Sequence, residues 1–233
     1  NTKYGEALSA PGIKGNQIHA LADFARPFRE GDSKIGVEGS IFTTLYQGDW
    51  SNYFLVNAAP YILFSGLDWH ARLGADVLFQ SMDGSQFRVV PNVDVKWGIT
   101  EYSSLYAKVH GGYQPNTYLD MMEESRYVLP FGNVMPSFSH VDVEAGVKIG
   151  EVSGFRFDAF GGYRKTDDAH FLVLNGYDSD EGVQGPFIEA LKPVYATLSS
   201  SFVGGMVQAK VWAPLDVSLR VKKNFYNVED MTI

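Results

Sequence analysis

The dominant pattern along the chain is a strict alternation of apolar and polar residues. From 87 to 99 every odd position is apolar, while the even positions include Asp94 and Lys96. The same alternation recurs over 69–79 and 141–149. A period of two is the side-chain period of a β-strand whose two faces meet different surroundings. The pattern therefore predicts three strands that each have one apolar and one charged face.

Weaker alternation marks further strands along most of the chain. They are expected at about 17–25, 34–46, 53–65, 104–114, 154–165, 193–203, 206–213 and 215–224. The total is about eleven strands of eight to fourteen residues, whereas strands in soluble proteins usually have about five or six. Because no amphipathic helical stretch of convincing length is present, the fold class is all-β.

The connections between these strands fall into two classes. Glu101–Ser103 and Glu151–Ser153 are short turns, and both fall on one edge of the sheet. The connections Gln114–Ser137 and Thr166–Lys192 are long, and both fall on the opposite edge. Short periplasmic turns and long extracellular loops are typical of a transmembrane antiparallel β-barrel. We expect such a barrel, with about twelve to fourteen strands.

Aromatic residues on the apolar face occur at a spacing that fits a bilayer. Trp69 and Phe79 are ten residues apart, as are Phe87 and Trp97. Ten residues on a strand tilted by about 40° span about 25 Å along the barrel axis, the height of the apolar band between aromatic girdles. The lipid-facing girdle candidates are Trp69, Phe79, Phe87, Trp97, Phe155 and Tyr163.

The opposite face carries interleaved charges of both signs, which suits the interior of a barrel. The lumen-lining candidates are Arg72, Asp76, Arg88, Asp94, Lys96, Lys108, Asp142, Glu144, Lys148, Arg156 and Asp158. The alternative is a soluble β-sandwich binding protein, in which a second sheet covers the apolar faces.

Composition narrows the function classes. A net charge of -8 argues against nucleic acid, because a phosphate-backbone binder needs a surplus of Lys and Arg. The absence of cysteine excludes disulfides, thiol nucleophiles and Cys-based zinc sites. No apolar run reaches the about 18 residues of a membrane-spanning helix.

Two segments carry a family resemblance. Residues 91–118 read PNVDVKWGITEYSSLYAKVHGGYQPNTY, and residues 139–173 read SHVDVEAGVKIGEVSGFRFDAFGGYRKTDDAHFLV. Both resemble the barrel portion of the TonB-dependent-receptor-like outer-membrane proteins of Bacteroides-type bacteria. The resemblance implies an outer-membrane β-barrel that acts as a receptor or porin.

The chain departs from that family in three respects. No segment resembles a plug domain or a TonB box, which argues against energised import. The C-terminal residue is Ile233 and not an aromatic residue. An odd count of about eleven strands leaves open that the sequence is incomplete. We treat residues 1–233 as a single barrel domain.

No constellation of residues predicts catalysis, a metal or a cofactor. His140, Asp142 and Glu144 share a strand face, but same-face side chains are about 6.6 Å apart, so a polar network is favoured over one ion site. The segment Ser199–Ser201 lacks an outward histidine and a G-x-S-x-G elbow, so we expect no enzyme. The acidic segment 175–182 is interpreted as a solvated loop and not as a calcium site.

The first long loop is unusually apolar. Its contact candidates are Tyr118, Met121, Met122, Tyr127 and Phe131. The loop either folds into the barrel mouth as a constriction or offers a contact patch to a partner. Residues 171–174 admit the same two interpretations, or extend the preceding strand.

These observations predict a non-enzymatic protein of a Gram-negative outer membrane, surrounded by outer-membrane lipids. The first hypothesis is a passive pore or receptor-like transport protein. The alternative is a barrel that anchors or scaffolds a complex, with its long loops binding a surface lipoprotein or another outer-membrane subunit.

Overall fold

The computed structural model describes most of the chain. The described residues are 2–6, 14–28, 33–47, 51–82, 84–125, 127–128, 134–152, 154–174, 191–212 and 215–232. Within these ranges no helix could cross a bilayer.

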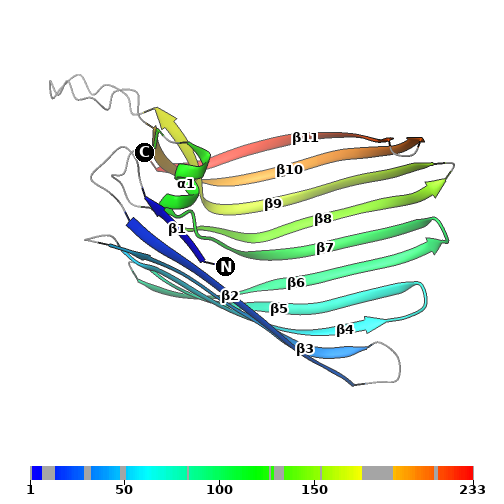
Figure 1. Ribbon diagram of the computed structural model, residues 1–233, viewed down its shortest axis with the longest axis horizontal. Helices are drawn as coiled ribbons and strands as arrows, with labels where there is room; N and C mark the ends of the chain where they lie inside the picture. The colour runs from blue at the N-terminus through cyan, green and yellow to red at the C-terminus, as the bar shows by residue number, and fades with distance from the viewer. Residues whose placement is uncertain are drawn as a thin grey trace.

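The described strands form a single antiparallel sheet (Figure 1). Along the chain the elements are β1 (Thr2–Glu6), β2 (Lys14–Pro27), β3 (Lys34–Tyr46), β4 (Tyr53–Ser65), β5 (Trp69–Ser81), β6 (Ser85–Thr100), β7 (Ser103–Gln114), α1 (Tyr118–Glu124), β8 (Ser137–Val152), β9 (Phe155–Leu174), β10 (Leu191–Trp212) and β11 (Leu215–Thr232). Their order in the sheet is their order in the chain, from β1 to β11. The all-β antiparallel prediction is confirmed; the described residues hold eleven strands, fewer than the expected twelve to fourteen.

The two long connections lie on one rim and the connections 66–68 and 101–102 lie on the other, as predicted, but the tight connection between β5 and β6 lies on the rim of the long connections. Residues 66–68 and 101–102 link strands on one rim, which we call the short-turn rim. Residues 115–136 and 175–190 link strands on the other rim, which we call the mouth. The second long connection begins later than expected, because β9 continues to Leu174.

The outer face of the sheet is apolar and uncovered. Trp69 pairs with Trp97 and Phe79 pairs with Phe87, so each end of the predicted band carries two neighbouring aromatic rings. These four side chains are 46, 58, 40 and 66% exposed, respectively. Because the described strands belong to one sheet, no second sheet within them covers this face, and the sandwich alternative is wrong for this part of the chain.

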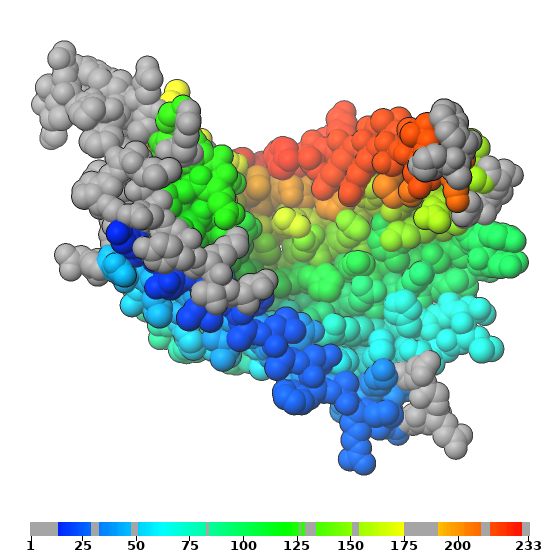
Figure 2. All heavy atoms as spheres, viewed as in Figure 1, coloured from blue at the N-terminus to red at the C-terminus, as the bar shows by residue number. Residues whose placement is uncertain are grey.

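The opposite, inner face lines a hollow. Figure 2 shows the space-filling surface recessed between the β2 side and the β11 side of the sheet. The polar parity of every strand from β5 to β8 points to this face, since Arg72, Asp94, Lys108 and Glu144 follow one another in register.

Two strands differ from the sequence prediction. Strand β10 is continuous over 22 residues, whereas the alternation predicted two shorter strands at 193–203 and 206–213. Gly204 and Gly205 do not end the strand because both stay paired, with Val221 and Lys222 on one side and with Ala159 and Phe160 on the other. Strand β1 was not predicted, since its five residues are too few for a period to be read.

Several inner glycines are required by aromatic rings on neighbouring strands. A Cβ atom at Gly204 would lie 2.7 Å from the ring of Phe160, and one at Gly36 would lie 2.6 Å from the ring of Tyr61. At Gly162 the Cβ would collide with the Phe202 ring and with a backbone oxygen of β8. Glycine thus lets each ring lie flat against the wall, which keeps it out of the hollow.

We predict that Gly162→Ala destabilises the protein by about 1–3 kcal/mol, because the added methyl group overpacks a filled position. Urea unfolding in detergent micelles, followed by tryptophan fluorescence, measures the change. Gly205→Ala is the matched control, because its Cβ would lie 3.5 Å from the nearest atom, the Asp158 carbonyl oxygen. Equal midpoints for the two variants would contradict the packing argument.

Candidate functional site

A row of alternating charges crosses the inner face. Arg72 of β5 pairs with Asp94 of β6, Asp94 pairs with Lys108 of β7, and Lys108 pairs with Glu144 of β8. The Lys108 Nζ atom lies 3.7 Å from Asp94 Oδ2. Directly opposed cross-strand residues of opposite charge stabilise a sheet by about 0.2–1 kcal/mol per pair. The row is therefore balanced in charge and polar throughout.

Further polar contacts extend this network to the strands on either side. Arg72 Nη2 donates to Glu38 Oε2 of β3 at 2.8 Å, and Arg164 of β9 forms an ion pair with Asp142 of β8. These contacts lie on the same face as the charge row, so the inner wall from β3 to β9 is held by polar side chains.

Aromatic rings on the inner face are covered by cations. The Arg72 guanidinium lies 4.1 Å from the centroid of the Tyr61 ring, and Lys222 Nζ lies 3.8 Å from that of Phe202. Lys148 over Tyr106 at 4.5 Å and Arg220 over Phe160 at 4.9 Å repeat the arrangement. Each ring also lies against a glycine on a neighbouring strand, so it is held between the glycine and the cation. The inner surface therefore exposes the charged groups and not the rings.

The connection between β7 and β8 folds over the mouth. We call its described residues (115–125, 127–128 and 134–136) the mouth strap. The strap contains α1, which begins with a capping box: the Thr117 side chain accepts from the Asp120 backbone N–H, and the Asp120 carboxylate accepts from the Thr117 backbone N–H at 3.0 Å. The cap satisfies amide donors at the start of a helix too short to be stable alone.

The strap is attached to both sides of the hollow. On one side Gln17 Nε2 of β2 donates to Thr117 Oγ1 at 3.2 Å, and the Tyr118 backbone N–H donates to the Tyr46 hydroxyl of β3 at 3.1 Å. On the other side the Met135 backbone N–H donates to the Tyr195 hydroxyl of β10 at 2.8 Å. Because β3 and β10 are far apart in the sheet order, the strap spans the hollow at the mouth.

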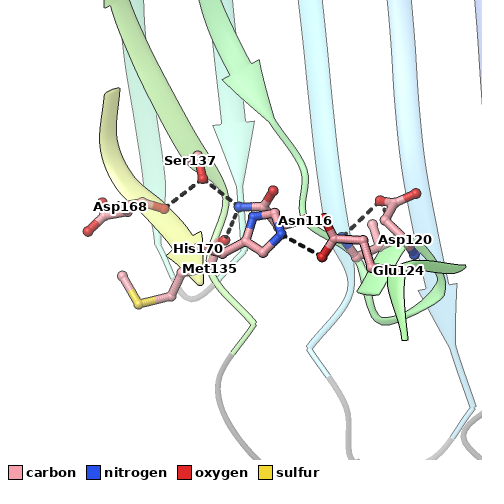
Figure 3. Close-up of polar contacts among 8 residues, drawn as sticks. Asn116, Asp120, Glu124, Met135, Ser137, Asp168 and His170 are labelled. Carbon is pink, nitrogen blue, oxygen red and sulfur yellow. Dashed lines mark hydrogen bonds and ion pairs between the residues drawn. The ribbon is translucent and has the colours of Figure 1, made fainter. Parts of the chain in front are cut away.

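A second polar group holds the strap to β8 and β9 (Figure 3). Asn116 Nδ2 donates to the Ser137 hydroxyl at 2.6 Å, and the same hydroxyl donates to the Asp168 carbonyl oxygen at 2.6 Å. Figure 3 also shows His170 of β9 facing Glu124 at the end of α1, with 3.0 Å between Nε2 and Oε2. Asn116 has a φ of 50°, a left-handed conformation that asparagine tolerates better than most residues.

Apolar side chains fill the space between the strap and the wall. Tyr118 and Met121 are 4 and 1% exposed, and they pack with Val128, Val134 and Tyr195. A neighbouring cluster on the wall contains Leu78, Val90 and Phe138. The strap is therefore folded against the wall, and its apolar residues form, together with Tyr195 of β10, the largest buried cluster among the described residues.

A polar cavity of about 500 Å³ lies on the inner face between β7 and β11. Its lining includes Lys108, Glu144, Arg164, Lys222 and Tyr226. His170 and Ser137, which hold the strap, also line it, so the strap contacts border this cavity. The lining can form hydrogen bonds and ion pairs with a polar solute.

Burial suppresses the ionisation of Tyr118 in the strap and of its anchors Tyr46 and Tyr195, which lie at the mouth, beyond the aromatic band. It raises the pKa of Tyr46 to about 12, and it raises the pKa of Tyr118 and Tyr195 above the usual tyrosine value. The neutral hydroxyls therefore contribute stability at pH values below 10, and this contribution falls as pH rises through the folded-state pKa values.

The structure places the candidate residues on the faces expected from the sequence. The eleven lumen candidates lie on the inner parity of their strands, and the six girdle candidates lie on the outer parity, each at least 40% exposed. Their roles toward a lumen and lipid stay predictions.

The contact candidates of the first long loop fall into buried, exposed and undescribed residues. Tyr118 and Met121 are buried and Met122 is partly buried, so the loop folds into the mouth and does not offer these residues as a contact patch. Tyr127 is 58% exposed. Phe131 and the acidic segment 175–182 lie outside the described residues.

Sequence reasoning missed the anchors of the strap. Gln17, Tyr46 and Tyr195 are far from the strap in the chain, and nothing in their local pattern marks them. The capping pair Thr117 and Asp120 was a readable signal for α1.

Comparison with known proteins shows the fold class of this sheet. No family model matches the chain, and no curated protein matches it either. The FrpB iron transporter from Neisseria meningitidis is similar over 93% of this chain and 36% of its own, with 14% identity and a TM-score of 0.54. The alignment with the copper transporter OprC covers 94% of this chain and 40% of the OprC chain, with 10% identity and a TM-score of 0.56.

A third structure is the pyoverdine outer membrane receptor FpvA from Pseudomonas aeruginosa PAO1, bound to pyoverdine. The alignment covers 99% of this chain and 38% of the FpvA chain, with 11% identity and a TM-score of 0.53. The chain thus spans well under half the length of these proteins. The sheet has the fold of a barrel wall like that of TonB-dependent receptors, as the sequence resemblance implied, whereas a Bacteroides-type lineage stays a prediction.

We predict that Thr117→Ala loosens the mouth strap by about 1 kcal/mol or more, because the helix loses its N-cap and Gln17 loses its acceptor. Amide hydrogen exchange over 118–124 should accelerate several-fold. Thr100→Ala, on the opposite rim, is the control and should leave exchange in α1 unchanged. Unaltered exchange in Thr117→Ala would show that the cap does not hold the strap.

We also predict that the strap loosens between pH 10 and about 12. The Tyr46 hydroxyl ionises less readily in its buried site than in water, so ionisation favours the state in which the strap has detached and Tyr46 is exposed. The near-ultraviolet circular dichroism of the tyrosines should stay constant up to pH 10 and decline above it. A decline already complete at pH 9 would rule out tyrosine ionisation as its cause.

Proposed function

We propose that the chain forms part of the wall of an outer-membrane β-barrel that transports a polar solute past the mouth strap. The observation that carries this proposal is the division of one sheet into an exposed apolar outer face and a charge-balanced inner face. In water the outer face would be unfavourable, because burying apolar area is worth about 25 cal/mol per Å². In a bilayer the same face meets acyl chains.

Three features support transport. The inner wall is polar along its length, so it can form hydrogen bonds with a polar solute. Its aromatic rings lie flat against glycines and leave the hollow wide. The strap narrows the mouth, which gives the barrel a selective entrance as well as a passage. Similar structures include an iron transporter, a copper transporter and a pyoverdine receptor.

The location is tested by thiol labelling, because the chain has no cysteine to give background. Ser200 lines the inner cavity, and Val203 on the same strand is 55% exposed on the outer face. In native membranes we expect a water-soluble maleimide to label Ser200→Cys and to leave Val203→Cys unlabelled. Equal labelling of both would refute the membrane placement.

Transport is tested by conductance of the full protein in planar bilayers. Replacing residues 117–125 with a Gly-Ser segment removes α1, so we expect a several-fold larger single-channel conductance than for the unaltered protein. The control replaces residues 66–68, on the short-turn rim, and should not change the conductance. A barrel that stays sealed after the strap is removed would argue against transport and in favour of a scaffolding role.

A further inference from the structure

The inner cavity between β7 and β11 carries more positive than negative charge. Its lining contains three cations, Lys108, Arg164 and Lys222, and two carboxylates, Asp142 and Glu144. The whole chain, in contrast, has a net charge of -8. The cavity is therefore positive although the chain is acidic.

Both carboxylates of the cavity are balanced by two of its cations. Asp142 forms an ion pair with Arg164 of β9, and Glu144 lies directly opposite Lys108 in the β7–β8 register. Lys108 also reaches Asp94 of β6 at 3.7 Å, so it is shared between two carboxylates. Neither of these two cations is left over for a solute.

Lys222 is the third cation, and the described residues give it no ion-pair partner. Its backbone belongs to β11, but its Nζ atom lies 3.8 Å from the centroid of the Phe202 ring of β10, so the ammonium lies over the wall and borders the cavity. A ring covers one side of an ammonium group, which has three N–H donors. Donors therefore remain for a ligand in the cavity.

Neutral hydrogen-bond donors lie around this ammonium. Ser200, Asn224 and Tyr226 line the same cavity, and Asn224 pairs with Phe202, whose ring lies below Lys222. Hydroxyl and amide groups can each donate to an oxyanion. A cation surrounded by such donors forms charge-assisted hydrogen bonds with a carboxylate or a phosphate.

A second cation follows on the same face of β11. Arg220 is the next inner residue toward the short-turn rim, about 6.6 Å from Lys222 along the strand, and its guanidinium lies over a ring of β9. Asp158 is two strands away on the same row, where it accepts from the Tyr106 hydroxyl at 3.3 Å and lies opposite Lys148. An anion that leaves Lys222 for the short-turn rim therefore meets another cation.

We propose that the solute carried past the mouth strap is an anion, whose carboxylate or phosphate group binds Lys222 in the inner cavity. This inference rests on the proposed function and adds the chemical class of the solute. Ser200, Asn224 and Tyr226 donate to the oxygens of the anion, and Arg220 receives it below the cavity.

The charge preference is measured by thiol modification of the full chain in detergent micelles. Ser200→Cys places a thiol in the cavity, two residues from Phe202. Two methanethiosulfonate reagents are compared, the negative sulfonatoethyl and the positive trimethylammonioethyl form, each rate being divided by the rate with free cysteine. We expect the negative reagent to be favoured several-fold, and Lys222→Gln to remove most of this preference.

Lys223→Gln is the matched control. It removes the same charge from the next residue of the same strand, but Lys223 lies on the outer face with its Nζ atom 5.1 Å from the centroid of the Phe225 ring. This variant should keep the preference, and so should Lys222→Arg, which retains the charge. Equal rate ratios in Lys222→Gln and Lys223→Gln would overturn the inference.

Protection of the Ser200→Cys thiol identifies the group that binds. Inorganic phosphate or acetate replaces chloride at constant ionic strength, and uncharged methyl methanethiosulfonate reports access to the thiol. Slower modification in phosphate assigns a phosphate group to the solute, and slower modification in acetate assigns a carboxylate. Either protection should disappear in Lys222→Gln, and a lack of protection by both anions would refute the site.

These results separate the inference from the proposed function. Labelling of Val203→Cys in membranes, or a barrel that stays sealed without the strap, contradicts the proposed function and leaves the rate ratio in micelles unaffected. A barrel that conducts while Lys222→Gln leaves the rate ratio unchanged retains transport and refutes the anion.

Discussion

The continuous antiparallel hydrogen-bond ladder is the interaction on which the rest of this structure depends. It runs from β1 to β11 with every neighbour in chain order, so the register of one strand fixes the facing of the next. Ile41, Val56, Phe79 and Phe87 consequently form one outer row across four strands. A shift of one residue in any strand would exchange its apolar and charged faces.

The inner face shows how a wall can contain aromatic rings and still present a polar surface. Each of four rings lies against a glycine on a neighbouring strand and below a cation. The ring thereby buries its apolar area in the wall, and the charged group above it faces the hollow. The charge row from Arg72 to Glu144 is made of cross-strand neighbours and does not need long side chains to reach across open space.

The alternating pattern was sufficient to predict most of the wall, because the period of two is a local property of each strand. It placed β3, β4 and the first long connection at their observed bounds. It failed at Gly204, where a ring on the neighbouring strand compensates for the missing side chain, and that ring is not visible in the local sequence. The anchors of the strap were not predicted for a related reason. Gln17 and Tyr195 are brought to the strap by the curvature of the whole sheet, which no local pattern shows.

The attachment of the strap has a consequence for the order of assembly. Gln17 precedes Thr117 by 100 residues, and Tyr195 follows Met135 by 60 residues. The strap can be seated only after strands on both sides of it are in place, and contacts between distant parts of a chain form slowly. A folding intermediate in which β10 is not yet paired would leave Tyr118 and Met121 exposed. Such an intermediate presents an apolar segment that chaperones and proteases can recognise and that the finished fold buries.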